Sequence, residues 1–254
     1  MIRLPGLAYR FYERRLARSL PADKLPHHIG VMVDGNRRWA KLAGSPTMAG
    51  HQAGADKILE FLDWCEELGI KVVTLYMLST DNLNREPAEL RDLLSVIGAL
   101  LDQLGEAKRV EVQQVGARDL LPDELAEKLS ALEAHTAGRT GVHVNVAIGY
   151  GGRREILDAV KSLLHDAAQQ GRSLNEVAEA ISIEQIGSYL YTKGQPDPDL
   201  VIRTSGEQRL SGFLTWQSAY SEFYFCEALW PDFRRVDFLR ALRDFADRQR
   251  RFGT

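Results

Sequence analysis

The sequence predicts a single α/β domain in which helices surround a parallel sheet. Apolar runs at residues 29–33, 72–78 and 142–148 have the length and continuous hydrophobicity of strands that are buried on both faces. Longer amphipathic segments lie between them, and this alternation of strands and helices is typical of a parallel sheet. The chain has 254 residues, of which 44% are hydrophobic, so it can bury a sizeable core. We therefore expect one domain over residues 1–254.

A basic amphipathic helix is predicted within residues 1–24. Residues 4–20 place apolar side chains near one helical face, and the first twenty residues contain five arginines and one glutamate. Such a helix either packs on the domain or lies on a membrane surface. We favour packing, because a peripheral membrane helix usually has a more pronounced apolar face.

The first strand, residues 29–33, is followed at once by Asp34, Gly35 and Asn36 and then by a helix. Ligands of open α/β sheets bind at the carboxyl ends of strands, and a helix start attracts anions. Arg37 and Arg38 oppose the helix dipole, so a bound phosphate group would explain their presence. Asp34 would repel that phosphate unless Mg²⁺ bridged the two. An ordinary turn with solvated arginines explains this stretch equally well.

Two further segments carry polar groups where a helix begins or a strand ends. His51 stands in the first turn of a helix predicted over residues 50–68, where it can bind an anion or simply act as a capping or core residue. The strand at residues 72–78 ends in a polar turn made of Ser79, Thr80, Asp81 and Asn82, followed by Arg85 and a helix from Pro87.

The second half of the chain continues the alternation. Strands are predicted at residues 110–115, 142–148, 200–202 and 222–225, and helices at 122–136, 152–171 and 235–251, with two short helices within 173–191. Residues 203–211, after a strand end, contain two arginines, three hydroxyl side chains and a glycine, a combination suited to holding phosphate oxygens. A solvated loop is the alternative, but the apolar residues that follow indicate a packed loop.

Composition excludes several other classes of protein. A formal net charge of −3 argues against nucleic acid as the main partner, since that would require a basic face. Cys65 and Cys226 lie far apart without metal-like spacing, so neither a disulfide framework nor a zinc site is expected. The chain contains no apolar run of the roughly 18 residues that span a membrane. We expect a cytoplasmic protein, with membrane association through the N-terminal helix as the open alternative.

Taken together, the motifs resemble those of the cis-prenyltransferases, the Z-isoprenyl diphosphate synthases that include undecaprenyl diphosphate synthase. The resemblance extends from His28 to the end of the chain and rests on several separated motifs in the same order. These are DGNRRWA (residues 34–40), GHQAG (50–54), LSTDNLNR (78–85), NVAIGYGGR (145–153), DLVIRTSGEQRLSGFLTWQ (199–217), SEFYF (221–225) and the terminal RRFG (250–253).

This resemblance implies a homodimer with a mostly parallel six-stranded central sheet and an elongated hydrophobic tunnel. It also implies Mg²⁺-dependent condensation of isopentenyl diphosphate with an allylic diphosphate, which adds a cis double bond. Asp34 and Asn82 would be catalytic, and Asp34 and Glu222 would hold the metal. The implied substrate-binding residues are Gly35, Asn36, Arg37, Arg38, Trp39, His51, Ser79, Arg85, Arg203, Arg209, Ser211, Arg251 and Gly253, the last two acting across the dimer.

Several positions depart from the family pattern. The family commonly has glycine at Arg37, arginine at Thr47, glutamate at Asp81, tryptophan at Leu83 and glycine at Ser205. Thr47 removes one phosphate-binding arginine, and we hypothesise that Arg37 supplies the missing charge. Leu83 indicates a modified allylic pocket.

Met77 bears on the length of the product. Long-chain family members have a small alanine at this position, whereas short-chain members have a bulky side chain. A bulky side chain would block the tunnel early, so we predict a short product, (2Z,6E)-farnesyl diphosphate made from geranyl diphosphate. The opposing consideration is that an unbranched methionine can move aside.

Two alternatives remain. One is a medium- or long-chain polyprenyl diphosphate synthase that supplies a lipid carrier for cell-wall glycans. The other is a non-catalytic subunit that supports an active partner, although the presence of Asp34, Asn82, Arg203 and Arg209 argues against it. A trans-type synthase is disfavoured because the chain has no DDxxD cluster, and a Rossmann dehydrogenase because the first turn lacks G-x-G-x-x-G.

Overall fold

A six-stranded sheet forms the centre of the computed structural model, which describes residues 6–248. The strand order is β3-β4-β2-β1-β5-β6, and every neighbouring pair is parallel. The strands are β1 (His28–Met32), β2 (Val72–Ser79), β3 (Val110–Val115), β4 (Val142–Tyr150), β5 (Leu200–Arg203) and β6 (Glu222–Phe225). The predicted α/β fold is therefore confirmed, and each expected strand is present.

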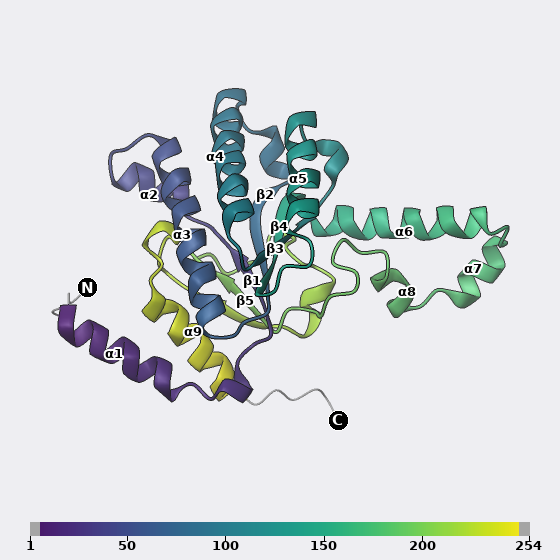
Figure 1. The fold of residues 1–254 in the computed structure, drawn as a ribbon. Coiled ribbons are helices and arrows are strands. Elements are labelled where there is room, and N and C mark those ends of the chain that lie inside the picture. Colours follow the sequence, from purple (N-terminus) through teal and green to yellow (C-terminus); the bar gives the residue numbers. More distant parts are fainter. Residues whose placement is uncertain (1–5, 249–254) are drawn as a thin grey trace.

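Helices connect these strands and cover the sheet (Figure 1). They are α1 (Gly6–Ser19), α2 (Asn36–Leu42), α3 (Thr47–Glu67), α4 (Pro87–Glu106), α5 (Asp123–Thr136), α6 (Gly152–Gln169), α7 (Leu174–Ala180), α8 (Ile183–Gly187) and α9 (Arg235–Asp247). Figure 1 shows α6 projecting away from the sheet, with α7 and α8 folded back beside it.

The main core lies where α3, α4, α5 and α9 pack against one face of the sheet. Phe61 on α3 is fully buried and lies at the centre of an aromatic group with Trp230 and Phe238, whose ring centroids are 5.7 and 4.8 Å from its own. These large rings bury apolar area and prefer such tilted arrangements. The opposite face carries a smaller apolar cluster that includes Tyr150 and Phe213.

The N-terminal helix packs on the domain, in agreement with the favoured expectation. Leu16 on α1 is buried against Val236 and Leu239 of α9, and Glu13 forms an ion pair with Arg235 (Nη1 to Oε1 3.1 Å). Among residues 6–248, no helix is long and apolar enough to cross a bilayer. Contact of α1 with a membrane surface stays a prediction.

The topology places a ligand site at the carboxyl end of β1. The chain passes from β1 to β2 on one side and later returns to β5 on the other side of β1. Strand order reverses around β1, and in open α/β sheets the crevice for ligands forms at such a point. The polar residues after β1, β2 and β5 are therefore brought to one edge of the sheet.

Backbone strain marks the loop that follows β5. Ser205 has φ of +80°, in the left-handed region that favours glycine, and its buried Oγ has no partner among the described residues. A residue with a Cβ loses about 1 kcal/mol or more in this region. This explains why glycine is common at the position, although the preceding strand and the backbone hydrogen bond from Ser205 N to Ala228 O (2.7 Å) hold serine there.

We predict that Ser205→Gly stabilises the protein. Relief of the left-handed strain and removal of the unpaired hydroxyl should outweigh the extra chain entropy of glycine, giving a net gain of about 1 kcal/mol in unfolding free energy. Urea denaturation followed by circular dichroism measures this change. Ser218→Gly is the matched control at a buried serine with negative φ, and it should destabilise the protein. A lower unfolding free energy for Ser205→Gly would contradict the account.

Candidate active site

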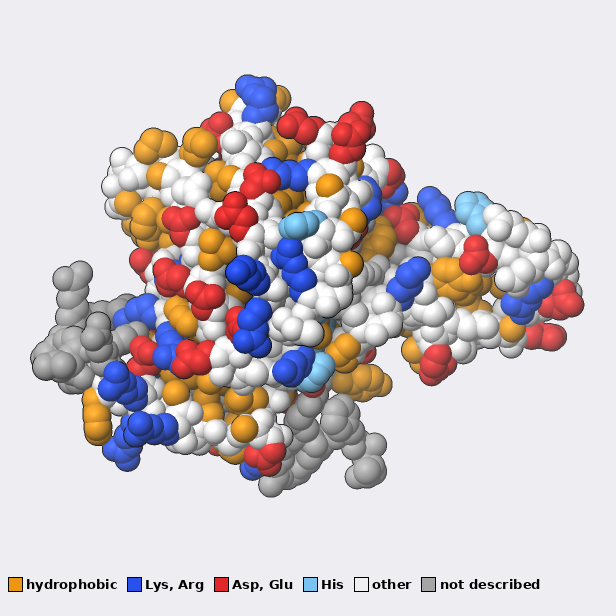
Figure 2. Space-filling model, in the orientation of Figure 1, with side chains coloured by type: hydrophobic (Ala, Val, Ile, Leu, Met, Phe, Trp, Pro, Cys, Tyr) orange, Lys and Arg blue, Asp and Glu red, His pale blue; other side chains and the backbone are white. Residues whose placement is uncertain are grey.

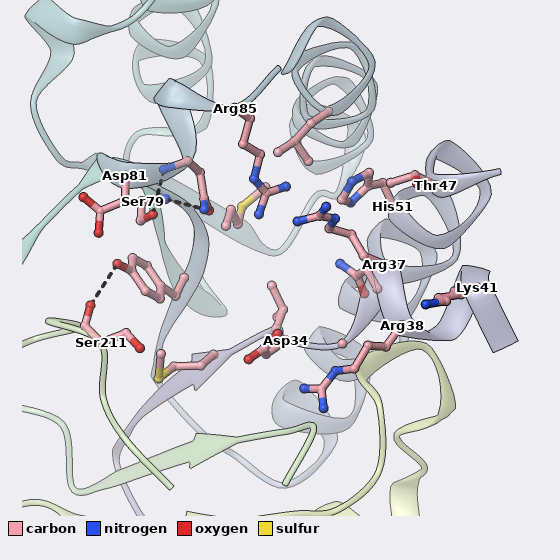
Figure 3. A pocket seen from close by; sticks show the side chains of 18 of the residues that line it. Asp34, Arg37, Arg38, Lys41, Thr47, His51, Ser79, Asp81, Arg85 and Ser211 are labelled. Atoms are coloured by element: carbon pink, nitrogen blue, oxygen red, sulfur yellow. Dashed lines mark hydrogen bonds between the residues drawn. The ribbon is translucent and has the colours of Figure 1, made fainter. Parts of the chain in front are cut away.

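A cavity of about 910 Å³ opens at the carboxyl ends of β1 and β2 (Figure 3). Its wall contains many of the residues expected to form the site, from β1, α2, α3, β2 and the loop after β5. These are Asp34, Gly35, Asn36, Arg37, Arg38, His51, Met77, Ser79, Asn82, Arg85, Arg203 and Ser211. Residues separated by up to 177 positions in sequence thus share one wall, as the parallel topology requires.

Close packing of α2 on α3 shapes one side of the cavity. A Cβ added at Gly50 would lie 2.2 Å from the backbone oxygen of Asn36, and one at Gly54 would lie 2.5 Å from its Oδ1. A side chain at Gly50 would therefore push the backbone of α2 away, and one at Gly54 would displace the Asn36 side chain. This requirement explains the GHQAG motif, and it sets His51 beside the first turn of α2.

An ion pair between Asp34 and Arg203 joins the ends of β1 and β5. Nη2 of Arg203 donates to Oδ2 of Asp34 at 2.8 Å, and Nη1 donates to Ser211 Oγ at 3.0 Å and to the backbone oxygen of Arg209. The Arg203 side chain is only 5% exposed, whereas the Asp34 side chain is 38% exposed and faces the cavity. A guanidinium so deeply buried requires charged or polar partners, so Arg203 fixes the position of the carboxylate.

Thr204 also connects the end of β5 to the turn after β1. Its Oγ1 lies 2.7 Å from the backbone oxygen of Asp34 and 3.2 Å from that of Met32, and it accepts from the backbone N–H of Asp34 at 3.1 Å. The fully buried threonine thereby orders the turn after β1. Its role was not predicted, because a threonine within a polar loop gives no signal that distinguishes it from its neighbours.

The opposite wall of the cavity is cationic. Figure 3 shows Arg37, Arg85 and His51 converging there. Arg37 Nε and Arg85 Nη1 lie 3.3 and 3.0 Å from the same oxygen, Oε1 of Glu89. Arg38 is half exposed nearby, and Lys41 adds a further cation to the wall. Such a group can bind the oxygens of a diphosphate.

His51 is buried, and neither of its ring nitrogens has a partner among the described residues. Burial, and next the charge of Arg85, lower the pKa of His51. The imidazole is therefore neutral at pH 7, with one N–H to donate and one nitrogen to accept. A buried polar group without a partner at a cavity wall is suited to meet a ligand.

The turn after β2 holds Asn82 in place. The backbone N–H of Asn82 donates to Ser79 Oγ at 3.1 Å, and the backbone N–H of Ser79 donates to Asn82 Oδ1 at 3.4 Å. This reciprocal pair orients the Asn82 amide NH₂ group. Across the cavity, Tyr76 Oη donates to the backbone oxygen of Ser211 at 3.4 Å, which connects the β2 end to the loop after β5.

Magnesium fits this cavity through one carboxylate. The described residues contain no group of three or more histidine, cysteine or acidic side chains that could hold a metal ion on their own. Mg²⁺ is usually held by one or two carboxylates together with substrate phosphates, and Asp34 offers a cavity-facing carboxylate across from the cationic wall. Asp34 is therefore the residue that would hold the ion.

Glu222 is not brought to Asp34 within one chain. It begins β6, where it pairs in register with Leu200 and thus lies level with Ile29, whereas Asp34 follows the other end of β1. Its carboxylate accepts from Arg248 Nη1 at 2.5 Å. The single chain does not bring these two acids together, and the role of Glu222 in the metal site, which the family resemblance implies, stays a prediction.

Four other expected residues also lie off the cavity wall or outside the described chain. Trp39 turns away and donates from Nε1 to Asp232 Oδ1 at 3.0 Å. Arg209 is exposed and pairs with Glu207, so only its backbone oxygen takes part in the Arg203 network. Arg251 and Gly253 lie outside residues 6–248. Substrate contacts by these residues stay predictions.

Comparisons with known proteins agree on one family. A family model described as putative undecaprenyl diphosphate synthase matches residues 32–253. Isoprenyl transferase 1 of Streptomyces avermitilis is 57% identical over 98% of this chain and 97% of its own. The (2Z,6E)-farnesyl diphosphate synthases of Thermobifida fusca and Mycolicibacterium smegmatis are 56% and 53% identical, covering 100% and 99% of this chain and 99% and 97% of theirs.

A solved structure agrees as well. Lavandulyl diphosphate synthase from Lavandula x intermedia, in complex with dimethylallyl diphosphate, superposes with a TM-score of 0.85 at 32% identity. The match covers 91% of this chain and all of that chain. The cavity at the end of β1, the motifs around it and these matches together show that the chain belongs to the undecaprenyl diphosphate synthase family of prenyltransferases.

Proposed function

We propose that the protein condenses one isopentenyl diphosphate with geranyl diphosphate in a Mg²⁺-dependent reaction and releases (2Z,6E)-farnesyl diphosphate. One observation carries the proposal: the ion pair between Asp34 and Arg203 faces a cationic wall across one cavity. Two separate sets of cations at one cavity suit two diphosphates, one for each substrate. Relatives named as (2Z,6E)-farnesyl or short-chain Z-isoprenyl diphosphate synthases support the choice of product.

The residues divide the work of binding. Arg203 and Ser211 would hold the isopentenyl diphosphate, whose terminal carbon attacks the allylic carbon as the allylic C–O bond breaks and a proton is lost. Arg38 and His51 would bind the departing diphosphate, and one well-placed donor of this kind typically contributes roughly 3 kcal/mol in the transition state. When bound through Asp34, Mg²⁺ would neutralise charge on that leaving group.

Turnover with defined primers tests this proposal. Purified protein is incubated with Mg²⁺, labelled isopentenyl diphosphate and either geranyl or farnesyl diphosphate, and the dephosphorylated products are separated by length. A single fifteen-carbon product from the geranyl primer is expected. A ladder of long products would favour the medium- or long-chain alternative. No turnover with either primer would favour the non-catalytic subunit.

Met77 supports the short product. It lies on β2, lines the cavity and packs against the main core. Leu93 on α4 also lines the cavity, and the residues one turn further along, Val96 and Ile97, are buried. Met77 and Leu93 thus stand between the cavity and the packed core, so a chain that grows past them must displace packed residues. An elongated tunnel beyond this point stays a prediction.

We predict that Met77→Ala lengthens the product. Removing the thioether opens space for at least one more isoprene unit. Products of twenty carbons or more should therefore appear when the dephosphorylated chains are separated by chromatography. The free energy of unfolding should fall by about 2 kcal/mol or more, as for other large-to-small core changes. Met48→Ala, an exposed methionine on α3, serves as the control. A product that stays at fifteen carbons in Met77→Ala would show that Met77 does not limit the product length.

Arg37 is proposed to replace the charge lost at Thr47. Both residues line the cavity, so either side chain can reach a common ligand. Arg37→Gly should raise the KM for the allylic primer about fivefold, which corresponds to about 1 kcal/mol for one charge-assisted contact of a half-exposed side chain. Steady-state kinetics measure the change, and Thr47→Arg added to Arg37→Gly should restore the KM. An unchanged KM in Arg37→Gly would refute the replacement.

We also propose a homodimer. Leu157, Val160 and Leu164 lie at i, i+3 and i+7 on α6, and the two leucines are 49% and 41% exposed. An exposed apolar stripe on a projecting helix indicates a protein interface. A second copy would cover it, and the expected role of Arg251 and Gly253 across the dimer stays a prediction.

The dimer is tested by charge at the stripe. Leu157→Glu combined with Leu164→Glu should convert the dimer to a monomer, because two carboxylates would be buried without partners. Sedimentation equilibrium gives the mass of each species. Leu174→Glu, at a leucine on α7 that is 78% exposed, is the control and should leave the mass unchanged. A wild-type protein that sediments as a monomer would overturn the proposal.

A cytoplasmic location is proposed from the cysteines. Cys65 and Cys226 are both free in the structure, which is usual for proteins of reducing compartments. Arg14, Arg15 and Arg18 on α1 are exposed, which suits a peripheral contact with anionic headgroups. Figure 2 shows Lys and Arg side chains gathered at the lower left of the molecule. That contact stays the alternative to a freely diffusing enzyme.

A further inference from the structure

The carboxylate of Glu89 bridges two arginines of the cavity wall, although Glu89 itself does not line the cavity. Oε1 of Glu89 lies 3.3 Å from Arg37 Nε and 3.0 Å from Arg85 Nη1. Arg37 belongs to α2, Arg85 precedes α4, and Glu89 stands in the first turn of α4. One acid therefore links the two helices that flank the cavity.

Helix capping does not account for Glu89. An acid in the first turn of a helix is favoured by the dipole and by N–H groups that need acceptors. At α4 this need is met by Glu86, whose Oε2 accepts from the backbone N–H groups of Ala88 and Glu89 at 2.9 and 3.1 Å. The contact with Arg37 also crosses from one helix to another, which a capping role does not require.

Electrostatics explain the bridge better. Arg37 and Arg85 repel each other, and Arg85 is partly desolvated, which together with Arg37 lowers its pKa. A shared carboxylate between two guanidinium groups offsets this repulsion and holds both side chains on the cavity side. Without it, Arg37, whose side chain is 59% exposed, would be free to turn towards solvent.

The bridge leaves donors available for a ligand. Arg37 uses Nε in this pair, and Arg85 uses Nη1, whereas a guanidinium carries five N–H donors in a planar fork. Figure 3 shows both arginine side chains extending towards the ring of His51, whose nitrogens have no partner among residues 6–248. A diphosphate placed there would meet two pre-oriented forks and one imidazole.

We propose that Glu89 is a positioning residue that orients Arg37 and Arg85 towards the diphosphate of the allylic primer. The inference rests on the proposed function, and it assigns a role to an acid that touches no substrate. It also shows how Arg37 can compensate for Thr47, because an arginine on α2 needs an anchor on α4 to face the cavity.

Kinetics of Glu89→Gln test the inference. The amide keeps the shape of the side chain but loses the charge that offsets two arginines. The KM for geranyl diphosphate should rise about fivefold to tenfold, while kcat and the KM for isopentenyl diphosphate change less than twofold. Glu89→Asp should recover part of the loss. Glu106→Gln, which removes an exposed acid at the far end of α4, controls for net charge and should have no effect.

A double-mutant cycle separates positioning from general stability. In the Arg37→Gly background, Glu89→Gln should have a clearly smaller effect on the allylic KM than in the wild type, since part of its target is gone. Thermal unfolding of Glu89→Gln should stay within a few degrees of the wild type. An unchanged or lower allylic KM in Glu89→Gln, or fully additive effects, would overturn the role.

Binding measured without turnover keeps the two proposals distinguishable. Calorimetric titration with geranyl diphosphate should give the same fivefold to tenfold loss of affinity in Glu89→Gln. If the wild type does not turn over but binds the primer, and Glu89→Gln weakens that binding, the proposed function fails and the positioning role stands. If the wild type turns over and Glu89→Gln binds the primer as well as the wild type, only the positioning role fails.

Discussion

The ion pair between Arg203 and Asp34 is the interaction on which the site depends. Arg203 ends β5 with its guanidinium buried, and a charge in that position requires a partner at the same end of the neighbouring strand. Asp34 is the partner because β1 and β5 pair in parallel and end together. Because β1 and β5 end at the same level, the ion pair holds the Asp34 carboxylate at one place in the cavity. Removal of either member would leave the other charge without compensation.

The two sides of the cavity are built in different ways. The Asp34 side consists of strand ends, a buried arginine and a buried threonine, and such close packing restricts side-chain movement. The opposite side comes from helix starts, where glycines allow α2 to approach α3 and long arginine side chains extend into the opening. A rigid anchor for one diphosphate and a more adaptable cradle for the other suit a reaction in which one diphosphate stays attached and the other departs.

Much of the fold could be predicted because buried parallel strands appear in the sequence as continuous apolar runs. The strand at residues 110–115 was located to the residue, and the helix starting at Pro87 was identified from its proline. Register could not be predicted, since any pairing of apolar strands satisfies the pattern equally. The role of Glu222 in the metal site came from the family resemblance, and within one chain Glu222 begins β6 whereas Asp34 follows the end of β1.

The ion-pair partners of side chains in loops, and of side chains that link two helices, also could not be predicted from the sequence. Arg209 pairs with Glu207 two residues earlier, a choice that depends on loop geometry and not on residue type. Glu89 resembles any acid in the first turn of a helix, and its link to Arg37 becomes visible only when α2 and α4 are placed together. Some of the predicted residues that line the cavity, such as Asp34 and Asn82, belong to turns directly after strands, where topology alone brings them to one edge. Others, such as Arg38 and His51, reach the cavity from α2 and α3.

The geometry of the new double bond is the most direct test of the account. The fifteen-carbon product of the wild-type protein and geranyl diphosphate is dephosphorylated and compared by gas chromatography with the (2Z,6E) and (2E,6E) alcohols. The account predicts the 2Z,6E isomer as the single product. A 2E double bond would contradict the assignment of the cavity to cis condensation.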